Sequence, residues 1–305
     1  MLTVALAILP IVVAIAIGYG LKERGVGAPV WAAAERSVFF LFLPALVFHH
    51  VAVRDVALGE VLAMVVPIAG IILGLGVVSY RLARWLTRSP PATAASVHQG
   101  SVRLNGVVMI ALVPALLGEQ VWPYIAVMTS VWPALSNTTS IVVYANAAGV
   151  HRSPRQIALA VIENPVVLAV LLGAACNVMG LGPLIVAVGV FKLLGSAALP
   201  VGLLAAGAAL EFASLRQSGP PTLLATVLKL AAMPAAMWGL CSGLGLPLLV
   251  TQIMVISAAL PCSPSGYVLA SQMGGDGQTM ASAITLQHVV GMVSVAAVAG
   301  WMLAG

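Results

Sequence analysis

Ten long apolar stretches, separated by short polar segments, limit the folds open to this chain more than any other feature. Most are near or above the roughly 20 residues that a helix needs to cross the hydrocarbon core of a bilayer. Charged residues make up 7% of the 305-residue sequence, against about a quarter in soluble domains. We therefore predict an all-α polytopic membrane protein. The ten predicted spans are 2–20, 37–53, 56–80, 92–117, 121–148, 157–179, 184–210, 221–246, 248–273 and 279–303.

The proline and glycine spacing of the first half recurs in the second half. The run from Leu9 to Ala14 corresponds to the run from Asn164 to Ala169, and each is followed by glycines at matching positions. Two copies with an odd number of crossings each would face opposite ways, as in many secondary transporters. We predict two inverted five-helix repeats, residues 1–150 and residues 151–305.

Basic residues gather at one end of the predicted spans. The residues on this side are Lys22, Arg24, Arg36, Arg81, Arg84, Arg88, Arg152, Arg155 and Arg216, whereas the opposite loops carry Arg54. The positive-inside rule then places the basic side in the cytoplasm and both termini outside the cell. Since the net charge of +5 is explained by topology, nucleic acid is not an expected partner. Three scattered cysteines lack metal-ligand spacing, so we predict no metal and no cofactor.

Predicted span nine contains a helix break. Pro261 and Pro264 lie three residues apart, next to Ser263, Ser265 and Gly266. Proline removes a backbone donor and clashes with the preceding turn, so carbonyl groups should be left free at membrane depth. Such backbone is tolerated where it packs against protein or lines a water-filled cavity. The alternative is a proline kink that is packed against neighbouring helices.

The corresponding part of span four carries Arg103, Asn105 and the flexible Gly106. At 1.5 Å per residue, Arg103 should lie roughly 15 Å from the start of its span. An arginine at that depth needs an anionic partner, and its planar guanidinium suits a carboxylate. We therefore predict an organic-anion site that includes Arg103 and Asn105. A structural ion pair between Arg103 and Glu163 is the alternative.

Polar residues recur near the middle of spans five and ten. Asn137, Gln287 and His288 are the candidates for substrate contacts there, together with Ser263, Pro264 and Ser265 of span nine. His288 could titrate or could be a neutral, hydrogen-bonded histidine. Glu163 is the candidate for proton coupling, and its alternative is an interfacial residue that caps a helix.

The segment 259–276, which reads ALPCSPSGYVLASQMGGD, is similar to a signature of the auxin efflux carrier family. The bacterial malonate and malate permeases of this family are related to the plant PIN-type auxin exporters. Arg103-Leu104-Asn105 resembles the version of span four found in some bacterial members. The resemblance implies a sodium/proton-antiporter-like fold, with broken spans four and nine that cross at a carboxylate site and elevator-type movement. The sequence departs from many members in one respect, because no proline occupies the break in span four. The next proline, Pro114, lies about two helical turns after the break.

From these features we predict a permease of the cell (inner) membrane for a small organic anion such as malonate or malate. The expected partners are the anion and the lipid bilayer, and a homodimer is one option for its assembly. A channel or a ligand sensor on a transporter fold is the first alternative. An intramembrane serine hydrolase, with Ser265 of the segment Ser263-Pro264-Ser265-Gly266 as nucleophile and His288 as its base, is the second.

Overall fold

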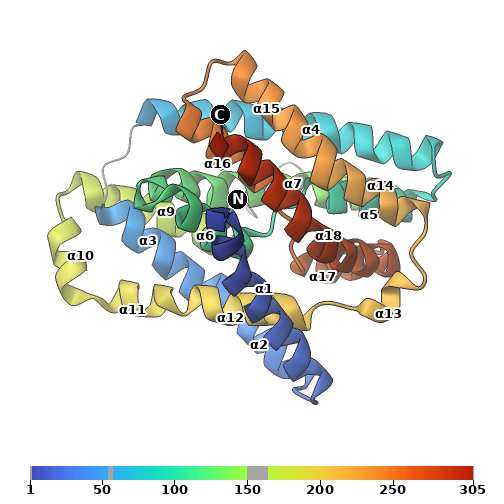
Figure 1. Cartoon of the computed structure of the whole chain (residues 1–305), viewed down its shortest axis with the longest axis horizontal. Coiled ribbons are helices and arrows are strands. Elements are labelled where there is room, and N and C mark those ends of the chain that lie inside the picture. The colour runs from blue at the N-terminus through green and yellow to red at the C-terminus, as the bar shows by residue number, and fades with distance from the viewer. Residues whose placement is uncertain (1, 54–57, 150–163, 305) are drawn as a thin grey trace.

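The computed structural model describes residues 2–53, 58–149 and 164–304, and within these ranges it consists of helices and their connections, without a strand (Figure 1). The helices before residue 150 are α1 (Leu2–Glu23), α2 (Ala28–Ser37), α3 (Leu43–Val53), α4 (Leu58–Trp85), α5 (Pro91–Val102), α6 (Gly106–Leu117) and α7 (Trp122–Ala147). A short 3-10 helix, Glu119–Val121, joins α6 to α7.

The helices after residue 163 are shorter on average. They are α9 (Pro165–Val178), α10 (Gly182–Val188), α11 (Val190–Ser196), α12 (Ala198–Ala208), α13 (Phe212–Leu215), α14 (Pro220–Val227), α15 (Met233–Gly243), α16 (Leu248–Ala258), α17 (Ser265–Gln272) and α18 (Gly277–Ala304).

Seven helices in the described residues are long and apolar enough to cross a membrane, or eight if the bent pair α9 and α10 forms one span. The protein is therefore a polytopic membrane protein, whereas the count of ten spans and the inverted repeat stay predictions. Three predicted spans are not among the seven. The α7 helix carries a polar cluster, and α16 and α17 are separated by a break. The third is predicted span six, of which the described residues contain the 14-residue helix α9, bent by 117° from α10.

The helices form two groups. In the first, which we call the scaffold group, α1 and α2 pack on α12, and α3 packs on α9, α10 and α11. In the second, the crossing group, α4, α5 and α7 pack on one another, and α14, α15, α17 and α18 pack on α4 or α5. The helix α16 joins this group through contacts with α6, α15 and α18. Figure 1 shows α11 and α12 along the bottom of the molecule and α4, α14 and α15 across its top.

A π-helical segment occurs in each group. Val38–Phe42 joins α2 to α3, and Leu228–Ala232 joins α14 to α15. Each segment ends two residues before a proline, Pro44 or Pro234. A proline frees a carbonyl one turn earlier, which is consistent with the wider turn. Such π-bulges are common at functional sites, and here one presents Lys229 to the interior.

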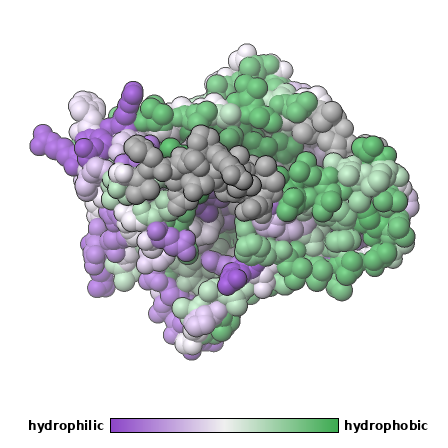
Figure 2. Space-filling view, turned by 180° about the vertical axis from the view of Figure 1, so that it is seen from behind, coloured by the Kyte–Doolittle hydropathy of each residue, from purple (hydrophilic) through white to green (hydrophobic). Residues whose placement is uncertain are grey.

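Hydrogen bonds connect several turns at the basic end of the molecule. Lys22 pairs with Glu211 and donates to the carbonyl of Leu210 at 2.8 Å. Gln278 donates to the carbonyl of Ser214. The described basic residues Arg24, Arg84, Arg88 and Arg216 are exposed. Figure 2 shows hydrophilic residues gathered at one end and hydrophobic residues covering the other. The membrane orientation of this end stays a prediction.

Two glycines allow α1 and α12 to touch. A Cβ atom at Gly18 would overlap the backbone of Leu204, and one at Gly207 would overlap the backbone of Ile15. Small residues at such positions let helix backbones approach closely, which is a main source of helix association in membranes. This close contact therefore holds α1 and α12 together in the scaffold group.

We predict that Gly18→Ala destabilises the protein, because the added methyl group must push α1 away from α12. The expected cost is about 1–3 kcal/mol, as for other overpacked contacts, measured as a lower unfolding temperature in detergent. Gly20→Ala is the matched control in the same helix, since a Cβ there meets no atom within 4 Å. Equal melting temperatures for the two variants would contradict the close contact.

Candidate functional site

Two interrupted helices meet in the crossing group. The helix α5 ends before Arg103, and α6 begins after Asn105. The second interruption, residues 259–264, separates α16 from α17. The backbone N–H of Asn105 donates to the carbonyl of Pro261 at 3.0 Å, which joins the two breaks directly. The predicted helix-break residues Pro261 and Pro264 lie in the second interruption. Gly106 and Gly266 are at the starts of the helices that follow the two breaks.

The side chain of Gln287 connects the two breaks through hydrogen bonds. Its Oε1 accepts from the backbone N–H of Cys262 at 2.9 Å, and its Nε2 donates to the carbonyls of Gly100 at 3.0 Å and Ala225 at 3.4 Å. The side chain is fully buried. Gln287 therefore pairs the N–H of Cys262 and the carbonyl of Gly100, which lie in or next to the interruptions and would otherwise be free at membrane depth.

Asn105 and His288 form a second internal connection. Asn105 caps α6 by accepting from the backbone N–H of Val108, and its Nδ2 lies 3.1 Å from Nε2 of His288. The other ring nitrogen of His288 lies 2.8 Å from the carbonyl of Ile284. Both nitrogens are thus engaged if the proton is on Nδ1, so this geometry favours the neutral histidine among the two predicted alternatives.

Arg103 lies beside these connections and has neutral hydrogen-bond partners. Its Nη2 donates to the hydroxyl of Ser265 at 2.9 Å. The orientation of the Gln99 amide that satisfies both of its ends brings its oxygen 3.1 Å from Nη1 of Arg103. Among the described residues the single ion pair is that of Lys22 with Glu211. Arg103 therefore has no carboxylate partner in that part of the chain, and Glu163 lies outside it.

A cavity of about 180 Å³, which we call the site cavity, lies between the two helix groups. Six of the predicted substrate residues line it, namely Arg103, Asn105, Asn137, Ser263, Pro264 and Ser265. The scaffold group contributes Glu35, Phe39 and Ala205, among others. The Oδ1 atom of Asn137 is buried and has no hydrogen-bond partner among the described residues. Gln287 and His288 do not line this cavity, and their hydrogen bonds are to the protein itself.

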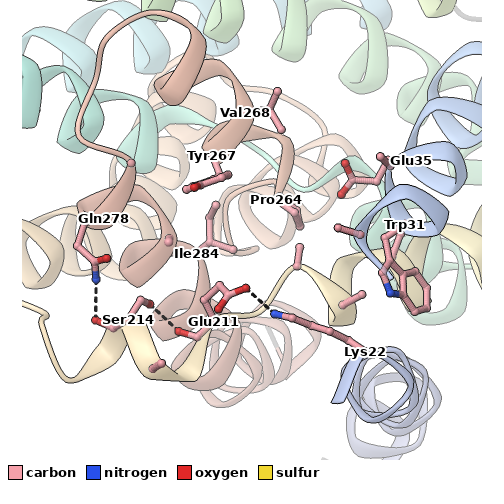
Figure 3. Close-up of a pocket in the computed structure, with 18 of the residues that line it drawn as sticks. Lys22, Trp31, Glu35, Glu211, Ser214, Pro264, Tyr267, Val268, Gln278 and Ile284 are labelled. Atoms are coloured by element: carbon pink, nitrogen blue, oxygen red, sulfur yellow. Dashed lines mark hydrogen bonds and ion pairs between the residues drawn. The ribbon is translucent and has the colours of Figure 1, made fainter. Parts of the chain in front are cut away.

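A larger cavity of about 590 Å³ adjoins the first, and we call it the vestibule. Figure 3 shows Glu35, Tyr267, Pro264 and Gln278 around it, with Lys22 and Glu211 at one edge. Glu35 and Pro264 also line the site cavity. The vestibule therefore leads from the basic end of the molecule toward the two interrupted helices.

A second basic side chain, that of Lys229, lies in the crossing group. Lys229 is fully buried and donates to the carbonyl of Ala258, the last residue of α16, at 2.9 Å. Its Nζ lies 5.5 Å from the centre of the Trp132 ring, a distance typical of a cation–π contact. A cation is favourable at a helix C-terminus because of the helix dipole. Lys229 therefore has partners that Arg103 lacks.

Sequence reasoning missed Glu35, Gln99 and Tyr144 at this site. Tyr144 is bonded to Gln99 and to Ser96, which positions the glutamine that holds Arg103. The spacing of Gln99, one helical turn before Arg103, could have indicated their contact. Glu35 gave no such signal, because its approach to Arg103 depends on packing between the two helix groups.

Comparison with protein families gives a match to the second half of the chain. Residues 149–299 match the family described as "Membrane transport protein". The chain belongs to the auxin efflux carrier family of membrane transporters. The resemblance of segment 259–276 to this family is thereby confirmed. Comparison with curated proteins gave no match.

The transporter signature ends in Asp276, which connects α18 to α5. Its carboxylate accepts from the backbone N–H and hydroxyl of Thr279 and from the hydroxyl of Thr93. Partial burial raises the pKa of Asp276, but these hydrogen bonds outweigh it and leave the pKa below its usual value. The ionised form therefore stabilises the start of α18 and the α5–α18 contact.

We predict that acid weakens the transporter partly through Asp276. A carboxylate with a lowered pKa in the folded state stabilises at pH values above its unfolded pKa of about 3.9, and this stabilisation is lost as pH falls through the folded value. Asp276→Asn keeps a cap residue without the charge, so its unfolding temperature should fall less than that of the wild type between pH 6 and pH 3. Glu23→Gln, at the exposed end of α1, should behave as the wild type does.

We also predict that Gln287→Met destabilises the two interrupted segments, between α5 and α6 and between α16 and α17. The change removes the partners of the N–H of Cys262 and of the carbonyl of Gly100, each at a cost of about 1–3 kcal/mol when buried. The unfolding temperature should fall, and Cys262, which is fully buried, should react faster with a maleimide when the other two cysteines are replaced by alanine. Gln252→Met, which removes one hydrogen bond to Met302, is the control. An unchanged rate of Cys262 labelling would contradict the role of Gln287 in holding the two interruptions together.

Proposed function

We propose that this transporter carries a small organic anion, a carboxylate or dicarboxylate of the malonate or malate class, across the cell membrane. The observation that carries the proposal is the guanidinium of Arg103, which faces the site cavity and has no carboxylate partner among the described residues. A guanidinium binds a carboxylate through two parallel hydrogen bonds. The cavity of about 180 Å³ suits a small solute more than the drug-sized ligands of typical pockets.

The helix ends favour the same charge. The N-termini of α6 and α17 both border the site cavity through Gly106 and Ser265. Half-helix N-termini of this kind carry partial positive charge and point at anionic substrate groups in other transporters. Ser263, which lies 2.9 Å from Ser265, and Asn137 would supply further polar contacts to the anion.

The two helix groups support elevator-type alternating access as the mode of movement. The site cavity has walls from both groups, so sliding one group along the other would alter access to the cargo. Sodium is not needed to satisfy the carbonyl of Ala258, because Lys229 already donates to it. We therefore favour facilitated or proton-linked movement over sodium coupling.

The alternatives gain less support from the geometry. A hydrolase would need a serine bonded to a histidine, but Ser265 is bonded to Arg103 and Ser263, and His288 lies against Asn105 and Ile284. A channel or a ligand sensor would use the same cavity. Transport of a labelled carboxylate into proteoliposomes, saturating with concentration, separates a carrier from both.

We predict that a carboxylate raises the unfolding temperature of the purified protein and that Arg103→Gln strongly reduces this effect. A ligand that binds the folded state at 100 times its dissociation constant stabilises by about 2.7 kcal/mol. Loss of the charge-assisted hydrogen bonds should weaken affinity roughly 10- to 100-fold. The panel is malonate, malate, succinate and indole-acetate, with malonamide as the uncharged analogue.

The exposed Arg216→Gln variant removes the same charge far from the cavity and should respond as the wild type does. Equal stabilisation of wild type and Arg103→Gln would make Arg103 a structural residue. The anion-permease proposal would lose its support if no carboxylate stabilised the wild type at millimolar concentration.

A further inference from the structure

Glu35 stands out among the residues around the site because no substrate or structural role has been assigned to it. It lies on α2 of the scaffold group and lines the site cavity, the vestibule and a third cavity of about 310 Å³. Arg103 lines two of these three cavities with it. The carboxylate has no hydrogen bond or ion pair among the described residues. Figure 3 shows it pointing into the vestibule from α2.

We propose that Glu35 is a counter-charge that competes with the cargo for Arg103, so that binding of an anion is coupled to uptake of one proton by Glu35. This inference rests on the proposed anion site. When the cavity holds no cargo, ionised Glu35 balances the charge of Arg103 across the cavity. When a carboxylate binds to Arg103, two negative charges share one poorly solvated space, which favours protonation of Glu35.

The charged groups around Glu35 leave Arg103 as its main electrostatic partner. Lys22 faces the vestibule but is paired with Glu211. Arg36, the next residue on α2, is exposed and lines the third cavity. Tyr267 of α17 faces the vestibule, and α12, which packs on α2, has no titratable residue over Ala198–Ala208. Among the described residues that line the site cavity, Glu35 and Arg103 are the two with charged side chains.

Glu35 and Arg103 belong to different helix groups, so the proposed coupling would depend on how the groups are placed. Arg103 is on the crossing group and Glu35 is on the scaffold group. If the groups slide during transport, the separation of these charges changes with the position of the cargo. Glu35 would then take up its proton when cargo and Arg103 are beside it and release the proton when they move away. Anion affinity and proton affinity are linked by thermodynamic reciprocity.

The test is the dissociation constant of malonate, malate and succinate between pH 6 and pH 8, measured by calorimetry with purified wild type and Glu35→Gln. Each ligand titrates identically with both proteins, so the difference between their pH slopes reports Glu35. We expect wild-type affinity to fall more steeply as pH rises, by up to about tenfold per pH unit. At pH 8, Glu35→Gln should bind about tenfold more tightly than the wild type because the competing charge is absent.

Two further variants make the result specific. Glu35→Asp keeps the charge and should keep the pH dependence, which also guards against a Glu35→Gln protein that fails to fold. Glu23→Gln removes an exposed carboxylate outside the three cavities and should match the wild type. If the wild type binds a carboxylate but Glu35→Gln has the same affinity and pH slope, the role of Glu35 is overturned while the anion site stands. If the wild type binds none of the three anions, the anion site itself fails and this inference with it.

Discussion

The hydrogen bond from the N–H of Asn105 to the carbonyl of Pro261 is the contact on which the other features depend. Each interrupted helix leaves backbone groups that lipid cannot satisfy, so the two breaks are stable because they meet and pair. Gln287 extends this pairing to Cys262 and to two further carbonyls. The hydrogen bonds that join the two breaks are therefore needed for the fold itself. They also fix the position of the backbone that carries Arg103.

The two basic residues of the crossing group differ in their surroundings. Lys229 is fully buried, donates to the carbonyl end of α16, lies over an aromatic ring and does not line the site cavity. Arg103 has the hydroxyl of Ser265 and the amide oxygen of Gln99, which are neutral acceptors. A neutral acceptor stabilises a guanidinium less than a carboxylate does. Because Arg103 also lines the site cavity, these contacts support the proposal that an anion binds there.

The sequence was sufficient to locate the two helix breaks, because proline, glycine and arginine at membrane depth have few structural explanations, whereas their crossing was implied by the family resemblance. It did not separate residues that face a ligand from residues that pair with the backbone. Gln287 and His288 were predicted as substrate contacts on polarity alone, yet the structure gives their polar atoms protein partners. Glu35 was overlooked because a carboxylate so near the start of its span resembles an interfacial residue. Its significance comes from the packing of α2 beside the crossing, which no local pattern encodes.

A cavity with walls from two helix groups has a property that a cavity inside one group lacks. Its electrostatic potential depends on the relative position of the groups, since Arg103 is fixed to one and Glu35 to the other. Neither side chain has an ion-pair partner within the described residues, so the interaction between these two charges changes with that position. An anion held by Arg103 would therefore alter the free-energy difference between arrangements of the groups. If Arg103 binds the cargo as proposed, its charge can also bias the proposed movement of the two groups.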